Sequence, residues 1–519
     1  MGEELQFPGE QQEPAHHLHR GTNPAHLRGP LGQARRRGFV GRIGQHNGPQ
    51  ALGPLGQNAL AHGKPERLGQ VVVQRVIQLD KTEQVGKNLR MLENSLHHPL
   101  PGGAQAQPQA GIARELFACA VAAGNSEHKR AHFIGLPALV LDLAAQIAHG
   151  RYRPQRFTVF AVTDPKLREI FAAAFADRLV QQWLVRHIEP WWDARFIDDS
   201  YANRKGRGTQ AAIARLQQFM RQPGHRYYCK LDIRAFFPSI DRHRLLALWR
   251  AHLPRLPYAA QLRTRLDQVA SAILLQSPID PPPHESGNRI LLARIPPHKS
   301  LYHAPPGVGL PIGSLTSQFF ANVYLNELDQ FVKHTLKVRA YLRYVDDFVL
   351  LGDDSATLNR QRLAVEAFLH ERLGLALHPD KTVLQRCTQG IDFLGSIVYP
   401  GHRLTRQRSV RAFRRRLAWF KALVADMPGP VTPLAPMGTW RRWLANHAAF
   451  DAPGVPSRAL LERMLSTLNS YYGVFKHAHT YHLRKHLYHA ELGPLKRFFL
   501  PDGPAYEHLR IKKMWLPRR

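Results

Sequence analysis

Two adjacent aspartates interrupt an otherwise apolar stretch of the chain, YLRYVDDFVLL at residues 341–351. Side chains alternate between the two faces of a β-strand, so neighbouring carboxylates share one direction only where the strand turns tightly. The pattern therefore predicts a strand that turns at Asp346 and Asp347. Because an unpartnered buried carboxylate is costly, a divalent cation is the expected partner of the pair.

A third carboxylate ends a second apolar segment. Asp232 lies in KLDIRAFF, at residues 230–237, next to the backbone carbonyl of Ile233, which is a further candidate for metal binding. Mg²⁺ is usually held by one or two carboxylates together with substrate phosphates. Two such ions, about 4 Å apart, stabilise both the attacking and the leaving oxygen of a phosphoryl transfer. The candidate metal ligands are Asp232, Ile233, Asp346 and Asp347.

Two other pairs of aspartates occur in different surroundings. Asp198 and Asp199 precede a Ser-Tyr pair and a basic run. Asp353 and Asp354 precede small polar residues and the start of a predicted helix. Turn formation and helix capping explain both pairs, so we assign neither to the metal site.

The charge of the chain indicates a polyanionic partner. It has 71 Lys and Arg against 39 Asp and Glu, a formal net charge of +32. An excess of this size favours nucleic acid, with a ribosome-like or simply soluble basic protein as the alternative. Three widely separated cysteines form neither a Cys-pair zinc site nor a disulfide framework. Because there is no signal-peptide pattern and no membrane-spanning apolar run, we expect a cytoplasmic protein without a membrane role.

Composition changes sharply near residue 130. All tyrosines and tryptophans lie at or after Tyr152, whereas residues 1–127 are rich in Gly, Gln, His, Pro and Arg. Few aromatic residues leave little core, so we predict a low-complexity, largely disordered extension over residues 1–127, with one candidate helix at 71–96. The role of this extension stays open between an RNA-tethering arm, an unstructured tail and a misassigned start.

Hydrophobic periodicity predicts an α+β fold for the rest of the chain, with helices behind an antiparallel sheet. Strands are expected at residues 227–233 and 341–351, and a Pro- and His-rich surface loop is expected at residues 277–306. Helices are expected at residues 167–188, 209–220, 315–336 and 355–373.

The C-terminal region is strongly basic. Residues 403–421 contain seven Arg and one Lys and no acidic residue. At helical spacing the apolar residues share one face, while Arg408, Arg411 and Arg415 share another. We predict a small helical bundle whose arginine face contacts nucleic acid, because phosphates screen the mutual repulsion of the cations. A solvated charged face is the alternative.

The aspartate blocks resemble conserved motifs of the reverse transcriptase family. YVDD at residues 344–347 is similar to the family's Tyr-x-Asp-Asp signature. Six further blocks occur in family order within residues 152–485, a span of about two thirds of the chain, and are far more specific than YVDD alone. They are PKLREI at 165–170, DSYANRKGRGT at 199–209, KLDIRAFFPSID at 230–241, LPIGSLTSQFFANVYLNELD at 310–329, LHPDKT at 377–382 and GIDFLG at 390–395.

This resemblance implies a right-hand polymerase fold. The implied domains are fingers at residues 128–225, a palm at 226–400 and a helical thumb at 401–519. The resemblance also implies that Asp232, Asp346 and Asp347 are catalytic residues that bind two Mg²⁺ ions, which Mn²⁺ can replace.

The family motifs also imply residues that bind the incoming nucleotide. The ring of Phe237 would exclude a ribose 2′-hydroxyl and so select deoxynucleotides. Lys381 is similar to a lysine that acts as a general acid toward pyrophosphate. The other residues implied in dNTP binding are Lys166, Arg168, Arg204, Arg207, Gly313 and Gln318. For the cations among them, surface ion pairing is the alternative.

One block departs from the commoner family pattern. Group II intron and retron-like enzymes usually have Gln and Pro where this chain has Ile312 and Gln318. The Ile-Gly-x-x-x-Ser-Gln form resembles the reverse transcriptases of diversity-generating retroelements, as does SYYGVFKHAHTYHLRK at residues 470–485.

That resemblance implies a bacterial RNA-directed DNA polymerase that copies a template RNA from a DNA primer, uses dNTPs and makes errors at template adenines. A small basic accessory protein is an implied partner. The alternatives are a group II intron-like or defence-associated reverse transcriptase, and a non-catalytic RNA-binding protein or splicing helper.

Overall fold

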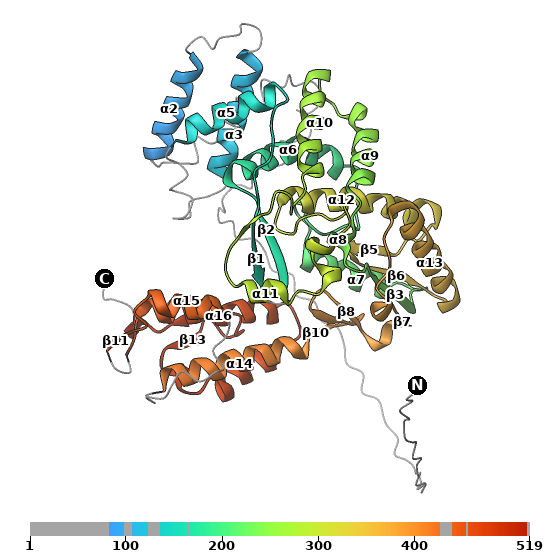
Figure 1. The fold of residues 1–519 in the computed structure, drawn as a ribbon. Helices are drawn as coiled ribbons and strands as arrows, with labels where there is room; N and C mark the ends of the chain where they lie inside the picture. The colour runs from blue at the N-terminus through green and yellow to red at the C-terminus, as the bar shows by residue number, and fades with distance from the viewer. Residues whose placement is uncertain are drawn as a thin grey trace, which may run out of the picture. The chain divides into compact units, whose positions relative to one another are not determined.

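A computed structural model describes residues 83–97, 106–122, 135–163, 166–425, 438–452 and 455–515. All of them belong to one compact unit, residues 63–519. Its main sheet has four antiparallel strands in the order β5-β6-β3-β7 (Figure 1). The strands are β3 (Tyr227–Asp232), β5 (Tyr341–Tyr344), β6 (Asp347–Gly352) and β7 (Val383–Arg386).

Apart from Asp347, the inner strand β6 is apolar because both faces of the sheet are covered there. On one face, Phe348 and Leu350 belong to the same buried cluster as the apolar residues of α12 (Leu315–Gln330). On the other face, Val349 packs with residues of α7 (Thr209–Met220). The predicted α+β fold, with helices against an antiparallel sheet, is confirmed.

A second sheet has the order β2-β1-β4. In it, β1 (Thr158–Val162) pairs antiparallel with β2 (Arg168–Ala172) and parallel with β4 (His284–Glu285). The predicted helix at residues 167–188 is therefore wrong at its start. Burial alternates along β2 with the period of a strand, and the helix α6 (Phe175–Asp193) begins only after it.

The segment at residues 277–306, called the insert below, is more ordered than the predicted surface loop. Besides β4 it contains α11 (Arg289–Ala293) and two 3-10 turns, η4 (Pro297–Lys299) and η5 (Leu301–His303). Leu301 is buried in an apolar cluster with Phe157 and Phe171. The Pro and His content of the insert indicates irregular structure, but it gives no sign that β1 recruits part of the insert as a third strand.

Two helices lie inside the extension that was predicted to be disordered, α2 (Glu83–His97) and α3 (Ala106–Ala122). Leu116 and Phe117 of α3 are buried in the core that α3 shares with α5 (Leu136–Ala148) and α6. α2 confirms the described part of the candidate helix at residues 71–96. The prediction for residues 1–127 is wrong for α3, because the average composition of the extension concealed a locally apolar segment. Residues 1–82, with the first part of the candidate helix at 71–96, lie outside the described residues.

The remaining elements of the region up to residue 405 are short helices and a small sheet. They are α8 (Phe236–Ser239), α9 (Arg242–His252), α10 (Ala260–Leu275), α13 (Ser355–Phe368), β8 (Ile391–Phe393), β9 (Ser396–Val398) and β10 (Arg403–Thr405). In the part of the chain that the structure describes, no helix combines the length and apolar character needed to cross a membrane.

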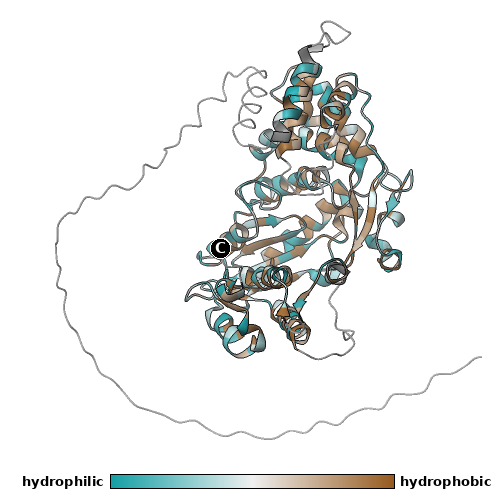
Figure 2. Cartoon of the chain, turned by 90° about the vertical axis from the view of Figure 1, so that its left-hand side faces the viewer, coloured by the Kyte–Doolittle hydropathy of each residue, from teal (hydrophilic) through white to brown (hydrophobic). Residues whose placement is uncertain are grey.

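The C-terminal region has an apolar core of its own. Its elements are α14 (Gln407–Val424), α15 (Gly438–Asn446), β11 (Phe450–Ala452), β12 (Val455–Pro456), α16 (Arg458–Phe475), α17 (Tyr481–His486), β13 (Phe499–Pro501) and β14 (Leu509–Ile511). On α14, Val410 and Phe413 are buried, whereas Arg408, Arg411 and Arg415 are exposed, as the periodicity predicts. Figure 2 shows this separation of hydrophobic and hydrophilic faces on the helices.

Candidate active site

The predicted aspartates meet at one edge of the main sheet. β3 and β6 pair so that Asp232 lies directly opposite Asp347. β5 and β6 form a hairpin with Val345 and Asp346 as its two-residue turn. The backbone N–H of Ile233 donates to the carbonyl oxygen of Asp346 at 3.2 Å. The sheet thus brings together the three carboxylates and Ile233, as predicted from the sequence.

The turn holds Val345 in an unfavourable backbone conformation. Its φ is 57°, in the left-handed region that β-branched residues rarely adopt. Nη1 of Arg343 donates to the carbonyl oxygen of Val345 at 3.1 Å. Strain of this kind persists where the surrounding structure fixes a backbone in place, and it is common next to functional groups.

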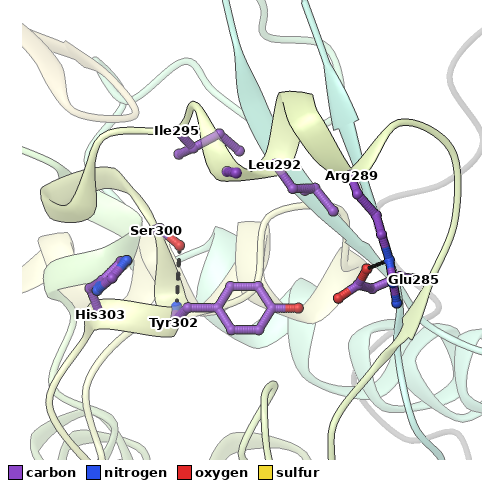
Figure 3. Close-up of a pocket in the computed structure, with 8 residues that line it drawn as sticks. Glu285, Arg289, Leu292, Ile295, Ser300, Tyr302 and His303 are labelled. Carbon is purple, nitrogen blue, oxygen red and sulfur yellow. Dashed lines mark hydrogen bonds and ion pairs between the residues drawn. The ribbon is translucent and has the colours of Figure 1, made fainter.

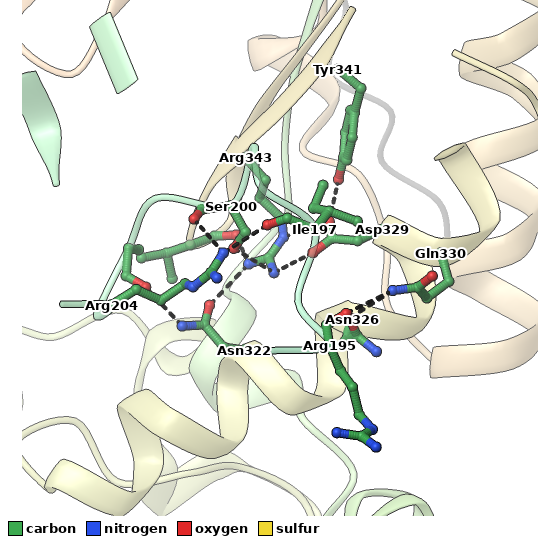
Figure 4. Close-up of polar contacts among 12 residues, drawn as sticks. Arg195, Ile197, Ser200, Arg204, Asn322, Asn326, Asp329, Gln330, Tyr341 and Arg343 are labelled. Carbon is green, nitrogen blue, oxygen red and sulfur yellow. Dashed lines mark hydrogen bonds and ion pairs between the residues drawn. The ribbon is translucent and has the colours of Figure 1, made fainter. Parts of the chain in front are cut away.

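Arg343 is the centre of a buried polar network that supports the turn (Figure 4). Its fully buried side chain makes a bidentate pair with Asp329 of α12, with N–O distances of 2.8 and 2.6 Å. It also donates to Oγ of Ser200 at 3.2 Å and to Oδ1 of Asn322 at 3.1 Å. The hydroxyl of Tyr341 donates to Asp329 at 2.7 Å. The network therefore connects α12 and the segment around Ser200 to the aspartate turn.

The aspartates face a cavity of about 800 Å³, called the main cavity below. Four of the residues predicted to bind the nucleotide line this cavity: Lys166, Arg168, Phe237 and Lys381. The half-buried ring of Phe237 lies 5.3 Å from the ring of Phe236, which is buried in the core. Of these two neighbouring rings, Phe237 is therefore the more accessible to a ligand in the main cavity.

Burial raises the pKa values of the two aspartates that follow Val345. The pKa of Asp346 rises to about 6, because of its burial and then because of the nearby Asp232 carboxylate. Burial raises the pKa of Asp347 to about 7, an effect that Lys230 opposes and the other two aspartates increase. Nζ of Lys230 lies 3.4 Å from Oδ1 of Asp347, but no described group makes a hydrogen bond to that buried oxygen. Crowded carboxylates with an unpartnered oxygen fit a hard divalent cation such as Mg²⁺.

Lys381 contacts one of the predicted metal ligands directly. Its Nζ donates to Oδ1 of Asp232 at 2.6 Å, while 41% of its side chain is exposed. This ion pair neutralises part of the carboxylate charge, so a cation that binds at Asp232 has to compete with it. The role of Lys381 toward pyrophosphate likewise requires its ammonium group to move away from Asp232.

The main cavity contains four basic residues that the sequence analysis missed: Arg234, His298, Lys299 and His378. Arg234 is placed there by its position two residues after Asp232, which is a signal that the sequence contains. His298 and Lys299 come from the insert, more than forty residues away in sequence from each of the three aspartates, and no local pattern links them to the aspartates.

Lys166 lies among these cations. Its pKa is lowered by burial first and then by Lys381, Arg168 and Arg408 of α14. Positive charges crowded in this way favour the binding of a polyanion such as a triphosphate. The influence of Arg408 on Lys166 also shows that one end of the basic face of α14 lies near the main cavity.

Arg204 and Arg207 do not reach the main cavity, which corrects their predicted role in nucleotide binding. The side chain of Arg204 is only 4% exposed and donates to the carboxylate of Asp193 at 2.5 Å and to the carbonyl oxygen of Ile197 at 2.7 Å. Arg207 pairs with Asp198 at 3.2 Å. Both arginines are therefore engaged by partners within the fold, the alternative that the sequence analysis left open.

The other aspartate pairs have the structural roles predicted for them. Asp199 is buried between Arg215 and Lys333, with N–O distances of 2.8 and 3.2 Å. Asp354 accepts two backbone N–H groups at the start of α13. Asp353 forms an exposed ion pair with an arginine.

The Gly313 turn packs closely against β2. Gly313 has a φ of 119°, and a Cβ atom there would lie 2.8 Å from Cγ2 of Ile170 and 2.9 Å from the carbonyl oxygen of Phe171. The N–H of Phe171 donates to the carbonyl oxygen of Ile312 at 2.8 Å. Ile312 lines the main cavity, whereas the predicted ligands Gly313 and Gln318 are not among the described residues that line it. Gly313 thus permits close backbone packing, a structural role in place of the predicted contact with the nucleotide.

Comparison with known proteins places this site in a family. Residues 163–398 match the family model described as reverse transcriptase (RNA-dependent DNA polymerase). The chain is 26% identical over 304 residues to protein YkfC of Escherichia coli (strain K12), which covers 51% of this chain and 71% of that protein. It is 21% identical to the group II intron-encoded protein LtrA of Lactococcus lactis subsp. cremoris, over 54% of this chain and 52% of that protein. It is 29% identical to the retron Mx65 reverse transcriptase of Myxococcus xanthus, over 31% of this chain and 34% of that protein.

Solved structures of telomerase also align with the chain. The telomerase of Candida albicans, in complex with a fragment of telomeric RNA, aligns with a TM-score of 0.34 and 13% identity, over 66% of this chain and 60% of that one. Apo telomerase of Candida tropicalis aligns with a TM-score of 0.36 and 10% identity, over 81% of this chain and 83% of that one. Among the sequence relatives, the chain spans 71% of the length of YkfC and about half of the length of LtrA. Residues 163–398, with their ordered motifs and sheet-edge aspartates, are therefore similar to the reverse transcriptase family.

Proposed function

We propose that the protein is an RNA-directed DNA polymerase that extends a DNA primer along an RNA template by two-metal nucleotidyl transfer. The observation that carries the proposal is that Asp232, Asp346 and Asp347 meet at a cavity that is also lined by basic residues: Lys166, Arg168, Arg234, Lys299 and Lys381. Carboxylates suit divalent cations, and Lys and Arg suit phosphate groups. The presence of all three carboxylates disfavours a non-catalytic RNA-binding protein or splicing helper.

Each group that lines the main cavity has a defined part in this reaction. Divalent cations bound by the three carboxylates and the Ile233 carbonyl would activate the primer 3′-hydroxyl and neutralise the leaving pyrophosphate. Lys166 and Arg168 bind the triphosphate and stabilise the negative charge that develops in the transition state. The ring of Phe237 excludes a 2′-hydroxyl. Lys381 transfers a proton from its Nζ to pyrophosphate after leaving its carboxylate partner.

The basic face of α14 holds the template and primer next to this cavity. Arg408, Arg411 and Arg415 are exposed along one side of the helix, and Arg408 is close enough to lower the pKa of Lys166. Contacts between arginines and phosphates do not depend on the nucleotide sequence, and they weaken as the salt concentration rises.

Primer extension tests the proposal. The purified protein is incubated with a DNA primer annealed to an RNA template, the four dNTPs and Mg²⁺. We expect cDNA that reaches the end of the template, no synthesis in the presence of a chelator, and recovery when Mg²⁺ or Mn²⁺ is added back. An absence of extension on every primed RNA template tested in the presence of metal would overturn the proposal.

A more specific function is favoured by Ile312. We further propose that the enzyme acts in a diversity-generating retroelement and copies template adenines with errors. Ile312 lines the main cavity and cannot donate a hydrogen bond there, so a mispaired base leaves no polar group of this side chain unsatisfied. The similarity to LtrA and to the retron enzyme supports the alternative, a group II intron-like or defence-associated reverse transcriptase. A small basic accessory protein and a bacterial cytoplasmic location remain predictions.

Sequencing the cDNA separates these two functions. We expect mismatches to concentrate opposite template adenines, and Ile312→Gln to reduce the adenine errors relative to all others. Leu315→Gln is the matched control, because Leu315 is 43% exposed on the same motif and does not line the main cavity. Faithful copying of adenines by the unmodified protein would contradict the diversifying function and leave the polymerase assignment intact.

A further inference from the structure

A second cavity, of about 450 Å³, adjoins the main cavity. The residues that line both cavities are Arg234, Ala235, Pro238 and His298. The two spaces therefore share one wall, which is formed by the segment after Asp232 and by the insert. A small ligand released beside Asp232 has the second cavity as its immediate neighbour.

The insert forms one wall of the second cavity and is held in place by hydrogen bonds to β2. Glu169 of β2 is 3% exposed and accepts a hydrogen bond from Oγ of Ser300 at 2.8 Å, and another from the N–H of Leu301. Glu169 and its neighbour Arg168 both line the main cavity, but Glu169 is buried and holds the insert, whereas Arg168 is exposed. Figure 3 shows this part of the insert, with Ser300 and His303 beside each other. The predicted surface loop is thus an anchored part of the polymerase domain.

The charge of the second cavity is predominantly positive. Its charged or titratable lining residues are Arg234, Arg244, His298, His303 and Asp241. The single acid among them is already engaged. Asp241 accepts two backbone N–H groups at the start of α9, at 2.9 and 3.0 Å, and pairs with Arg244 at 3.4 Å. Arg244 is engaged as well, because it also donates to the carbonyl oxygens of Glu371 and Arg372. Arg234 is exposed, and no described group forms a hydrogen bond or ion pair with its guanidinium. The second cavity therefore suits a small polyanion.

Nucleotidyl transfer produces such an anion at this place. The primer 3′-oxygen forms a bond to the α-phosphorus, and the bond from that phosphorus to the bridging oxygen breaks. The hydroxyl proton passes to solvent, and pyrophosphate leaves with the electron pair of the broken bond. We propose that the second cavity binds pyrophosphate and is the route by which it leaves the main cavity. This inference rests on the proposed polymerase function. An incoming triphosphate shares the same chemistry, and the experiment below distinguishes the two ligands.

The test adds negative charge to the second cavity without touching the main one. His303→Glu acts from the insert, and Ser239→Asp acts from the opposite wall; both residues line only the second of these two cavities. His284→Glu is the matched control, because His284 is exposed on the same insert and lines neither cavity. The readouts are inhibition of primer extension by added pyrophosphate, the rate of pyrophosphorolysis, and KM for dNTP.

We expect His303→Glu and Ser239→Asp each to raise the inhibition constant of pyrophosphate about tenfold, equivalent to about 1.4 kcal/mol, and to slow pyrophosphorolysis. In both variants, KM for dNTP should stay within about twofold of its value in the unmodified protein. In the control variant, all three readouts should stay within that range. Equal inhibition constants in all four proteins would overturn the proposal. A rise in KM for dNTP as large as the rise in the inhibition constant would show that the second cavity admits nucleotides, and would equally overturn the assignment to pyrophosphate.

A binding measurement keeps this outcome separate from the polymerase assignment. Pyrophosphate is titrated calorimetrically into the unmodified protein and into His303→Glu without divalent cations, so that no DNA synthesis is needed. Weaker binding by the variant supports the second cavity as the site even if no template is copied. Identical binding rules the site out even if the protein is an active polymerase.

Discussion

The buried pair of Arg343 and Asp329 should dominate the stability of the main sheet. Both side chains are fully buried, and they share two hydrogen bonds of 2.8 and 2.6 Å. Arg343→Met leaves the Asp329 carboxylate buried with the hydroxyl of Tyr341 as its remaining side-chain donor. Removing one partner of a buried ion pair costs about 3–5 kcal/mol of unfolding free energy. Asp329→Leu should cost a similar amount, because it leaves a buried guanidinium without its counter-ion.

The double variant Arg343→Met with Asp329→Leu tests the reasoning further. It removes both charges, but it leaves the carbonyl of Val345, the amide of Asn322 and the hydroxyl of Ser200 without the arginine. We therefore expect it to be less stable than the unmodified protein, but to lose about 2–3 kcal/mol less than the sum of the single variants.

Urea denaturation combined with hydrogen exchange of the β5 and β6 amides measures these effects. The exchange data are needed because a chain of this length does not have to unfold in a single transition. A single variant Arg343→Met within about 1 kcal/mol of the unmodified protein would refute the assigned role of the pair. So would losses that simply add in the double variant.

Four further substitutions separate packing from ligand binding. Gly313→Ala should lower the unfolding free energy by about 1–3 kcal/mol, because its Cβ meets Ile170 at 2.8 Å; a variant of unchanged stability would contradict this packing. Arg168→Met should raise KM for dNTP about tenfold without a change in stability, whereas Arg204→Met should lower stability by about 3 kcal/mol and leave KM nearly unchanged. The reverse pattern in kinetics and thermal melts would restore Arg204 as the nucleotide ligand. Phe237→Ala should increase ribonucleotide incorporation about 10- to 100-fold in a competition assay, and unchanged selectivity would place the 2′-hydroxyl filter elsewhere.

The positions of the three sheet-edge aspartates were predictable because their surroundings are local in sequence. Asp346 and Asp347 stand within an apolar strand, and Asp232 ends another, so each segment indicates a buried strand with a costly charge at its end. Strand pairing then places the two segments side by side. The amphipathic α14 was predictable for the same reason, since its pattern of Val, Phe and Arg is complete within one helix.

The errors concern contacts that no local sequence pattern indicates. Nothing near Arg204 shows that Asp193 and a buried carbonyl group engage its guanidinium. Lys299 reaches the main cavity only because Glu169 anchors the insert from a different strand. Composition averaged over residues 1–127 likewise concealed α3, whose burial depends on α5 and α6.

The central claim is that the sheet-edge aspartates carry nucleotidyl transfer, and one pair of variants tests it most directly. Asp346→Asn with Asp347→Asn keeps the shape of the turn but removes the charge that would hold divalent cations. The control, Asp353→Asn with Asp354→Asn, changes an exposed pair outside the main cavity and keeps a side chain able to cap α13.

RNA-templated primer extension is measured for both variants, with circular dichroism as the check on folding. We expect the first variant to fold and to lose about a hundredfold or more of its rate, and the control to retain the rate of the unmodified protein. Undiminished synthesis by the folded Asp346→Asn, Asp347→Asn variant would contradict the account.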